Sequence, residues 1–374
     1  MDFLRLRGVA ALVAVTAGCA LAAKPGEPLL IGQTADFSGP QASPVKETTE
    51  AARAYFDWVN KQGGIHGRPI ALESVDDGFD PKRTVANAQK MAAERPILAM
   101  MLSRGTANAE ALIPFTRERK ILVLAPVGGS ELMHRPADHY LFNIRPMHRL
   151  EAEKSVAQLS AQGLRRIAVA YVDDAMGNDA VKGALEGLKT AHLEPAALVT
   201  IPRGEPKVEA AVEKLAQVQP DAIIGLCIAK SCAALVKQLR AKGVYAQFVS
   251  MSNTSSSGYV KDLGPAARGV IVSQVYPYPF SDAPRASKEF RTLAAEYKLA
   301  QSYSAMEGFL AAKIMTEALR RAGPNPTREG VIRGMESLSH YDAGGFIIDF
   351  SPRSRTGSEY MELTMIGKEG KFVR

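Results

Sequence analysis

Apolar segments of strand length alternate with helical patterns along almost the whole chain, and this alternation restricts the fold more than any other feature. LLIGQTA (29–35) is typical of a buried strand, and residues 46–61 carry apolar side chains on one helical face. The same order returns between RIAVAYV (166–172) and QFVSM (247–251). Strands that alternate with helices form parallel sheets with helices on both faces. The pattern therefore predicts an α/β fold with two doubly wound, Rossmann-like lobes.

The two alternating runs meet near FNIRPMH (142–148), where we expect the chain to leave the first lobe. A second crossing is expected at QVYPYPFSD (274–282), whose prolines stiffen an extended segment. The lobes would then be joined by a hinge of several strands. The expected boundaries are residues 24–145 plus 278–352 for the N-terminal lobe and residues 146–277 plus 353–374 for the C-terminal lobe.

The first 23 residues have the pattern of a secretory signal peptide. Two arginines precede an apolar run over residues 8–17, small residues follow, and cleavage is expected after residue 22 or 23. Cys19 raises the alternative of a lipoprotein, which Thr16 disfavours because a lipobox has Leu or Val there. No later stretch reaches the roughly 18 apolar residues of a membrane-spanning helix. We therefore expect an exported protein in the periplasm.

The motifs of several large enzyme classes are missing from the sequence. No Gly-x-Gly-x-x-Gly follows the first strand, and there is no Gly-x-Ser-x-Gly, Walker A or His/Cys metal-binding spacing. The formal net charge is +7, but basic residues are mixed with acids and no aromatic stacking platform accompanies them. No repeats point to a structural role. We therefore expect no catalytic activity, no cofactor, no metal and no nucleic-acid partner.

The stretch GGIHGRPIALESVDDGFDP (63–81) places paired carboxylates near a histidine, as many active sites do. The leading glycines are expected to end a helix, since glycine accepts the positive φ of a C-cap. Asp80 before a proline has the pattern of a helix N-cap. Asp76 and Asp77 follow a strand, where backbone N–H groups need acceptors. With no partner acid or base in view, the carboxylates are interpreted as scaffolding.

Two cysteines, Cys227 and Cys232, remain after the expected cleavage. An oxidising compartment permits a disulfide between them. Because their spacing crosses a predicted strand-to-helix turn, the geometry permits or forbids the bond depending on local details. A disulfide and two buried free thiols both remain open at this point.

Several segments together resemble the type I periplasmic binding proteins, in the branch of leucine/isoleucine/valine-binding proteins that serve ABC importers. The segments include LLIGQTADFSGP, AYFDWVNKQGGIHGRPIALESVDDGFDPKRTVANAQKM, GTANAEALIPFTRERKILVLAP, HYLFNIRP and YSAMEGFLAAKIMTEALRRAG. Their order and spacing cover essentially the whole mature chain. The resemblance implies a monomer that closes its lobes around a small-molecule ligand and delivers it to an ABC permease in the inner membrane. A periplasmic ligand sensor of the same fold, acting on a receptor or regulator, is the alternative.

The resemblance also implies that the first lobe holds a ligand carboxylate with the turns at residues 105–107 and 127–130. Thr106 begins a predicted helix, whose free N–H groups and dipole favour an anion, although the hydroxyl could serve only as an N-cap. Gly128 and Gly129 let backbone N–H groups approach closely. Arg104 either adds a cation beside this turn or faces solvent.

Amino-acid binders of this branch use an acidic residue for the ligand ammonium, and the matching position here is about Ser252. Because an unpaired buried ammonium is costly, we expect a small organic acid more than a branched-chain amino acid. Glu307 restores a carboxylate if its helix faces the cleft; otherwise it faces solvent or the hinge. The expected ligand-binding residues are Ser38, Thr106, Ala107, Val127, Gly128, Gly129, Ser130, Met176, Ile228, Ser252, Asn253 and Glu307.

Overall fold

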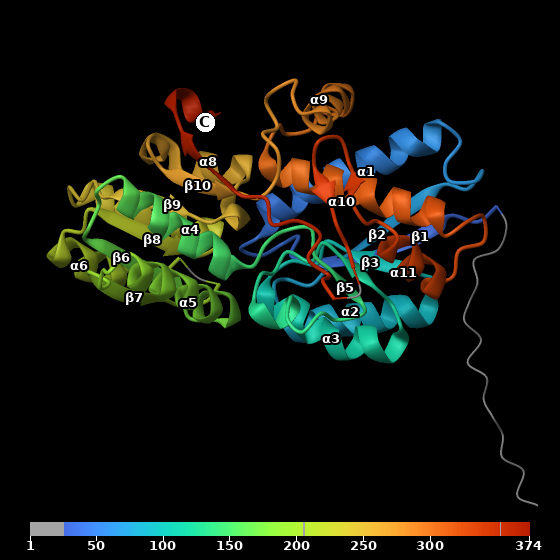
Figure 1. Ribbon diagram of the computed structural model, residues 1–374, viewed down its shortest axis with the longest axis horizontal. Coiled ribbons are helices and arrows are strands. Elements are labelled where there is room, and N and C mark those ends of the chain that lie inside the picture. Colours follow the sequence, from blue (N-terminus) through green and yellow to red (C-terminus); the bar gives the residue numbers. More distant parts are fainter. Residues whose placement is uncertain (1–25, 205, 352) are drawn as a thin grey trace, which may run out of the picture.

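The computed structural model describes residues 26–204, 206–351 and 353–374, which fold into two α/β lobes (Figure 1). The expected signal peptide (1–23), with Cys19, lies outside the described residues. The helices in the described part are each too short or too polar to cross a bilayer. Both lobes have the predicted architecture, in which helices cover the two faces of a mainly parallel sheet.

The first lobe is built on a five-stranded parallel sheet in the order β2-β1-β3-β4-β5. Its strands are β1 (Leu29–Ala35), β2 (Ile70–Asp76), β3 (Ala99–Met101), β4 (Val123–Leu124) and β5 (Leu141–Phe142). Its helices are α1 (Ala42–Lys61), α2 (Pro81–Glu94), α3 (Thr106–Arg119), α9 (Arg285–Tyr297), α10 (Tyr303–Arg321) and α11 (Arg328–Glu336), with the short hairpin β11 (Tyr341–Asp342) and β12 (Ile347–Ile348).

The alternation of side chains along each strand divides the core of the first lobe into two layers. Leu30 packs with apolar residues of α2 and α3, whereas its neighbours Leu29 and Ile31 pack with those of α1 and α10. Figure 1 shows α2 and α3 on one face of the sheet and α1, α10 and α11 on the other. Successive residues of a strand point to opposite faces, so a strand buried on both sides must be apolar throughout.

The second lobe has a seven-stranded sheet in the order β14-β13-β10-β9-β8-β6-β7. The parallel strands are β6 (Ile167–Val172), β7 (Ala197–Ile201), β8 (Ala222–Leu226), β9 (Gln247–Ser250) and β10 (Ile271–Gln274), and β13 (Glu362–Ile366) and β14 (Phe372–Val373) add an antiparallel edge. The helices are α4 (His148–Ala161), α5 (Ala175–Thr190), α6 (Glu209–Val218), α7 (Ala229–Ala241) and α8 (Ser257–Leu263).

The chain passes between the two sheets after β5, after β10 and again before β13. The first and last of these segments pair with each other: the N–H of Asn143 donates to the carbonyl of Arg355 (2.7 Å), and the N–H of Gly357 donates to the carbonyl of Asn143 (2.7 Å). These crossings form the hinge region. The expected boundaries between the lobes, at residues 145/146, 277/278 and 352/353, fall in or near these crossings, and their exact positions stay a prediction.

The aspartates after β2 accept hydrogen bonds from the backbone and from nearby hydroxyl groups. Asp76 accepts from the N–H of Phe37 (2.8 Å) and the hydroxyl of Ser38 (2.7 Å). Asp77 accepts from the hydroxyl of Thr84 (2.8 Å) and the N–H of Phe79 (3.0 Å). Asp80 accepts from the N–H of Lys82 (2.8 Å) and caps α2. These bonds account for the carboxylates as scaffolding, as the sequence predicted.

Cys227 and Cys232 form a disulfide, which decides the question that the sequence left open. The bond joins the end of β8 to the first turn of α7, with Cα atoms 5.6 Å apart. Both residues are fully buried, and they flank Ile228 at the cleft between the lobes.

Candidate ligand-binding site

A cavity of about 20 Å³ lies between the lobes, at the carboxyl ends of strands from both sheets. This volume is close to the space that one water molecule occupies. Doubly wound sheets bind their ligands at this edge, because the loops that follow the parallel strands meet there. The cavity is lined by Gln41, Phe79, Arg104, Gly105, Thr106, Val127, His148, Asp174, Met176, Ile228 and Asn253.

Five polar side chains at this cavity are more than nine-tenths buried. They are Gln41 (3% exposed), Arg104 (3%), Thr106 (3%), His148 (2%) and Asn253 (8%). Within the described residues, no hydrogen-bond partner reaches the Thr106 hydroxyl, the two His148 ring nitrogens, Nη1 of Arg104 or the Asn253 amide oxygen. Buried polar atoms are seldom left unpaired, since each costs about 1–3 kcal/mol. The cluster is therefore built to meet polar groups of a bound molecule.

Arg104 is held in place from both lobes. Its Nε donates to the amide oxygen of Gln41 (3.3 Å) in the first lobe, and its Nη2 donates to the backbone carbonyl of Asn253 (2.7 Å) in the second. Burial lowers the pKa of Arg104 to about 10, so the guanidinium remains charged at neutral pH. The alternative that Arg104 faces solvent is thus wrong.

A buried charge network lies beside the cavity, on the hinge side. Glu307 pairs with Arg104 (3.6 Å) and with Arg145 (3.4 Å), and it accepts a hydrogen bond from the Tyr276 hydroxyl (2.7 Å). Arg145 also lies 3.8 Å from the carboxylate of Glu151. Two guanidinium groups and two carboxylates therefore balance one another, as buried charges must.

This network decides where Glu307 stands relative to a ligand. Its side chain is buried, so the solvent-facing alternative is wrong. Its carboxylate already has two arginines and a tyrosine hydroxyl as partners. Ser252, expected as a ligand contact, is engaged in the same network, because its hydroxyl bonds to Arg145 and to Glu151 (3.0 Å). Neither residue lines the cavity itself.

The carboxylate that lines the cavity is that of Asp174, which also has partners. It accepts hydrogen bonds from the N–H groups of Met176 (2.9 Å) and Gly177 (3.1 Å), and so caps α5. Nε of Arg203 lies 3.4 Å from the other carboxylate oxygen. Burial raises the pKa of Asp174 despite these contacts. A ligand ammonium would therefore compete with an existing cation for this acid.

Gly129, in the turn after β4, makes room for His148. A Cβ atom on Gly129 would lie 1.7 Å from Cδ2 of His148, so no other residue fits there. His148 begins α4, and its N–H donates to the carbonyl of Gly129 (2.8 Å). Burial, with the neighbouring Arg145 guanidinium, lowers the pKa of His148 to about 3. The imidazole is therefore neutral and presents one donor and one acceptor.

The structure brings about half of the predicted contacts to the cavity wall. Thr106, Val127, Met176, Ile228 and Asn253 line it. The N-cap of α3 is Gly105, with φ of 98°, so Thr106 is the first helical residue and the N-cap alternative for it is wrong. The other predicted contacts near this wall lie in the same two turns and contribute no lining side chain. They are Ala107, Gly128, Gly129 and Ser130, whose hydroxyl bonds to Glu110.

Ser38 is exposed, bonds to Asp76 and does not line the cavity, so the geometry gives its predicted contact no support. Reasoning from the sequence missed Gln41, Phe79, His148 and Asp174. Gln41 and Asp174 follow β1 and β6, and this position after a parallel strand is the signal in the sequence that could have found them.

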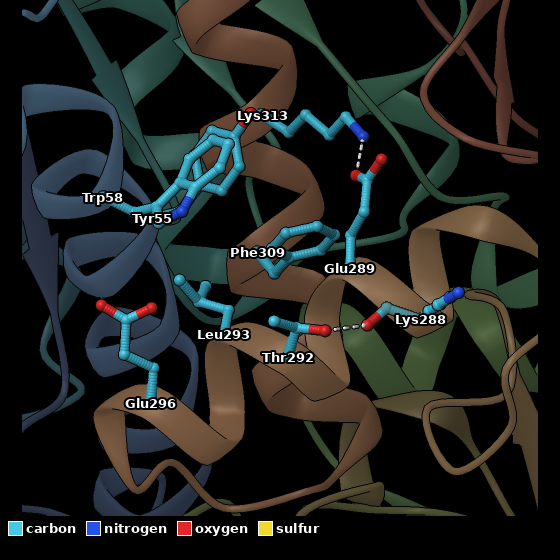
Figure 2. Close-up of a pocket in the computed structure, with 9 residues that line it drawn as sticks. All are labelled: Tyr55, Trp58, Lys288, Glu289, Thr292, Leu293, Glu296, Phe309 and Lys313. Atoms are coloured by element: carbon cyan, nitrogen blue, oxygen red, sulfur yellow. Dashed lines mark hydrogen bonds and ion pairs between the residues drawn. The ribbon is translucent and has the colours of Figure 1, made fainter. Parts of the chain in front are cut away.

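A larger hollow of about 340 Å³ lies on the outer surface of the first lobe, between α1, α9 and α10. Figure 2 shows Tyr55, Trp58 and Phe309 around it and Lys313 pointing toward Glu289, with which it forms an ion pair. None of the unpartnered buried atoms found in the described residues belongs to this hollow. It lacks the polar features that distinguish the cleft between the lobes.

Comparison with known proteins agrees with this geometry. The sequence model of the periplasmic binding protein family matches residues 28–371. Leu/Ile/Val-binding protein homolog 1 of Brucella melitensis is 25% identical over 326 residues, which cover 85% of each chain. A substrate-binding periplasmic protein from Ralstonia solanacearum is 35% identical, with a TM-score of 0.88 over 92% of this chain and 99% of that one.

A solute-binding protein of an ABC transporter from R. palustris, solved in complex with benzoate, is 19% identical, with a TM-score of 0.82 over 92% of this chain and 95% of its own. That likeness concerns the fold. The family match covers nearly all of the described residues, and the relatives are binding proteins and not enzymes. The chain belongs to the periplasmic binding protein family, as a type I member of the leucine/isoleucine/valine-binding branch.

Proposed function

We propose that this protein captures a small organic acid in the cleft between its lobes and presents the closed form to the permease of an ABC importer. The observation that carries this proposal is the set of buried donors at the cavity that lack a hydrogen-bond partner among the described residues. They are the hydroxyl of Thr106 and Nη1 of Arg104, which lies 3.6 Å from the Glu307 carboxylate, an ion-pair contact beyond hydrogen-bond distance. Charge-assisted hydrogen bonds to a carboxylate are among the strongest polar contacts in proteins.

The carboxylates of the site favour an acid over an amino acid. Glu307 is neutralised by two arginines, and Asp174 is engaged by Arg203 and by the start of α5. An ammonium group would thus enter a site in which neither of these two carboxylates is free, and its desolvation would be poorly compensated. The relatives point in different directions, because the name of the Brucella protein refers to branched-chain amino acids and the R. palustris protein was solved with benzoate. The choice between an amino acid and an organic acid as the ligand therefore rests on the residues of this cavity.

Hinge closure supplies the mechanism. Arg104 of the first lobe donates to the carbonyl of Asn253 in the second, and Glu47 on α1 accepts from the N–H groups of Ser257 (3.1 Å) and Gly258 (3.3 Å) on α8. Such contacts exist only while the lobes are together. A ligand that adds bonds to both walls stabilises the closed form by its differential affinity for that form.

The protein works in the periplasm as a monomer, after export by the signal peptide of residues 1–23. Its family and the absence of a membrane-spanning helix in the described residues support this location. The permease in the inner membrane recognises the closed form. Uptake of a radiolabelled acid by the wild-type strain and by a strain lacking this gene tests the importer role. Loss of uptake in the deletion strain is expected, and unchanged uptake would contradict it.

A thermal-shift screen tests the ligand class. The purified protein without residues 1–23 is heated with amino acids, aliphatic dicarboxylates, aromatic acids and amides. A ligand that binds only the native state raises the unfolding temperature by mass action, by about 2.7 kcal/mol at a hundred times its Kd. We expect a shift with organic acids and none with leucine or valine. A shift with leucine or valine alone would contradict the proposed ligand class.

A further inference from the structure

Phe79 is a wall residue of the cleft that reaches into the opposite lobe. It belongs to the turn after β2 in the first lobe, yet it packs in one apolar cluster with Val172, Met176 and Ile228 of the second. Its side chain is 6% exposed and lines the cavity. A bulky side chain therefore occupies space beside the ligand position, and it comes from the lobe opposite to the one that supplies its apolar neighbours.

The backbone of Phe79 is held in an unfavourable conformation. Its φ is 65°, in the left-handed region that bulky residues rarely adopt. The hydrogen bond from its N–H to Asp77 (3.0 Å) and that from Gly78 to Asp76 (3.1 Å) fix the turn. Strain of this kind persists where the surrounding structure enforces it, commonly at binding sites. The paired aspartates thus fix the position of Phe79 in the cleft.

Two further contacts complete the position of the ring. A Cβ atom on Gly105 would lie 2.7 Å from Cε2 of Phe79, so the ring packs directly against the turn that precedes Thr106. From the second lobe, Arg203 lies over the ring with its Cζ atom 4.3 Å from the centroid, and its Nη2 donates to the Phe79 carbonyl (3.0 Å). Nη2 also donates to Asn108 (3.2 Å). Arg203 therefore bridges the lobes over Phe79.

We propose that Phe79 sets the size of the ligand that the closed cleft accepts, and that Arg203 positions it from the opposite lobe. The inference rests on the proposed function, because it concerns the same cleft. A ligand with a large substituent would meet the ring, and the ring is prevented from moving by Gly105 on one side and by the guanidinium on the other. A smaller residue at position 79 leaves room for a larger substituent.

Calorimetric titration with three matched pairs of ligands tests the proposal. The pairs are pyruvate with alanine, 4-methyl-2-oxopentanoate with leucine, and phenylpyruvate with phenylalanine. Within each pair the substituent is the same and the 2-oxo group of the acid is replaced by a hydrogen and a charged ammonium group. From pair to pair the substituent grows from methyl to isobutyl to benzyl. The titrated proteins are the wild type, Phe79→Ala and the conservative variant Phe79→Leu. The leucine variant provides the measurement if the alanine variant does not fold. Arg203→Ala and the surface variant Arg291→Ala complete the set, since Arg291 pairs only with exposed Asp282 among the described residues.

The wild type should prefer the smallest acid. In both Phe79 variants, the affinity ratio of phenylpyruvate to pyruvate should rise on the order of tenfold or more, the usual scale for a pocket that gains or loses a few carbon atoms. Arg203→Ala should shift the ratio in the same direction by a smaller factor, and Arg291→Ala should leave it unchanged. A role of Phe79 in stability alone would weaken all ligands equally and would leave the ratio constant.

The outcomes separate the two proposals. A constant ratio in the Phe79 variants, with acids still bound, would overturn the inference and leave the proposed function standing. Binding of the amino acids alone, with the ratio of phenylalanine to alanine raised in the variants, would overturn the proposed ligand class and uphold the inference. Binding of none of the six compounds by any of the proteins would overturn both.

Discussion

Replacing Glu307 with Gln tests the description of the charge network most severely. This substitution keeps the size of the side chain and removes one negative charge at a site that is 4% exposed. After this substitution, the carboxylate of Glu151, 3.8 Å from the Arg145 guanidinium, is the one ion-pair partner that Arg145 keeps among the described residues. Arg104 loses the one carboxylate with which it pairs among the described residues. The hydrogen bond from Tyr276 can still be accepted by the amide oxygen.

The expected loss of stability follows from the burial of these groups. Removing one partner of a buried ion pair costs about 3–5 kcal/mol, because the other charge stays buried without compensation. Since Glu151 still balances Arg145 and the amide keeps the tyrosine bond, we expect about 3 kcal/mol for Glu307→Gln. The matched control is Glu213→Gln, which breaks the exposed Glu213–Lys242 pair (2.6 Å) and should cost less than about 1 kcal/mol.

Equilibrium unfolding in urea measures both variants, with far-UV circular dichroism and the fluorescence of Trp58 as probes. The sequence contains a single Trp, so its emission reports on the first lobe alone. A loss for Glu307→Gln that equals the loss for the control would refute the reasoning, since it would mean that the two arginines do not depend on this carboxylate.

Three further outcomes are expected. Thr106→Ala should weaken binding of the ligand about tenfold or more, because it removes a hydrogen bond to a charged group, and it should leave the unfolding temperature unchanged. Unchanged affinity in calorimetry would contradict a contact between Thr106 and the ligand. Cys227→Ser with Cys232→Ser should cost about 2 kcal/mol in urea, from the entropy of a loop of about six residues, and equal midpoints for the oxidised and reduced wild type would argue against it. Burial lowers the pKa values of His134 and His148 to about 3, so both stay neutral in the folded state while the unfolded chain takes up protons below pH 6.5. As the pH is lowered from about 6.5 to about 3, the free energy of unfolding should therefore fall by up to about 1.4 kcal/mol per pH unit for each histidine. The variant His134→Asn should show a smaller slope, and a free energy of unfolding that does not change with pH would contradict the burial of both rings.

The fold was predictable because its signals are local. The cap of α2 by Asp80, the turns after the strands and the apolar runs of β1 and β6 are each set by neighbouring residues in the chain. Both sheets and their parallel order follow from such segments. The lengths of the elements were less predictable: α1 begins at Ala42, four residues before the expected start, because Pro44 is tolerated in a first turn.

The cleft was only partly predictable, since its chemistry depends on contacts between distant parts of the chain. The turn with Thr106 was expected from the resemblance to binding proteins, and both Thr106 and Asn253 follow strands, whose carboxyl ends meet at one edge. The partners Arg104, Arg145 and Glu307 lie up to 203 residues apart in sequence, and an arginine beside a turn has the same local pattern whether it is exposed or buried. The position of Phe79 depends on a backbone angle that no residue type reveals.

A crystal structure with the acid that gives the largest thermal shift tests the central claim most directly. The account predicts electron density for the acid between the lobes, with its carboxylate bonded to Arg104 and to the hydroxyl of Thr106, and its substituent against Phe79. Density for the acid in the hollow between α1, α9 and α10, or a carboxylate bound in the cleft without contact to Arg104 or Thr106, would contradict it.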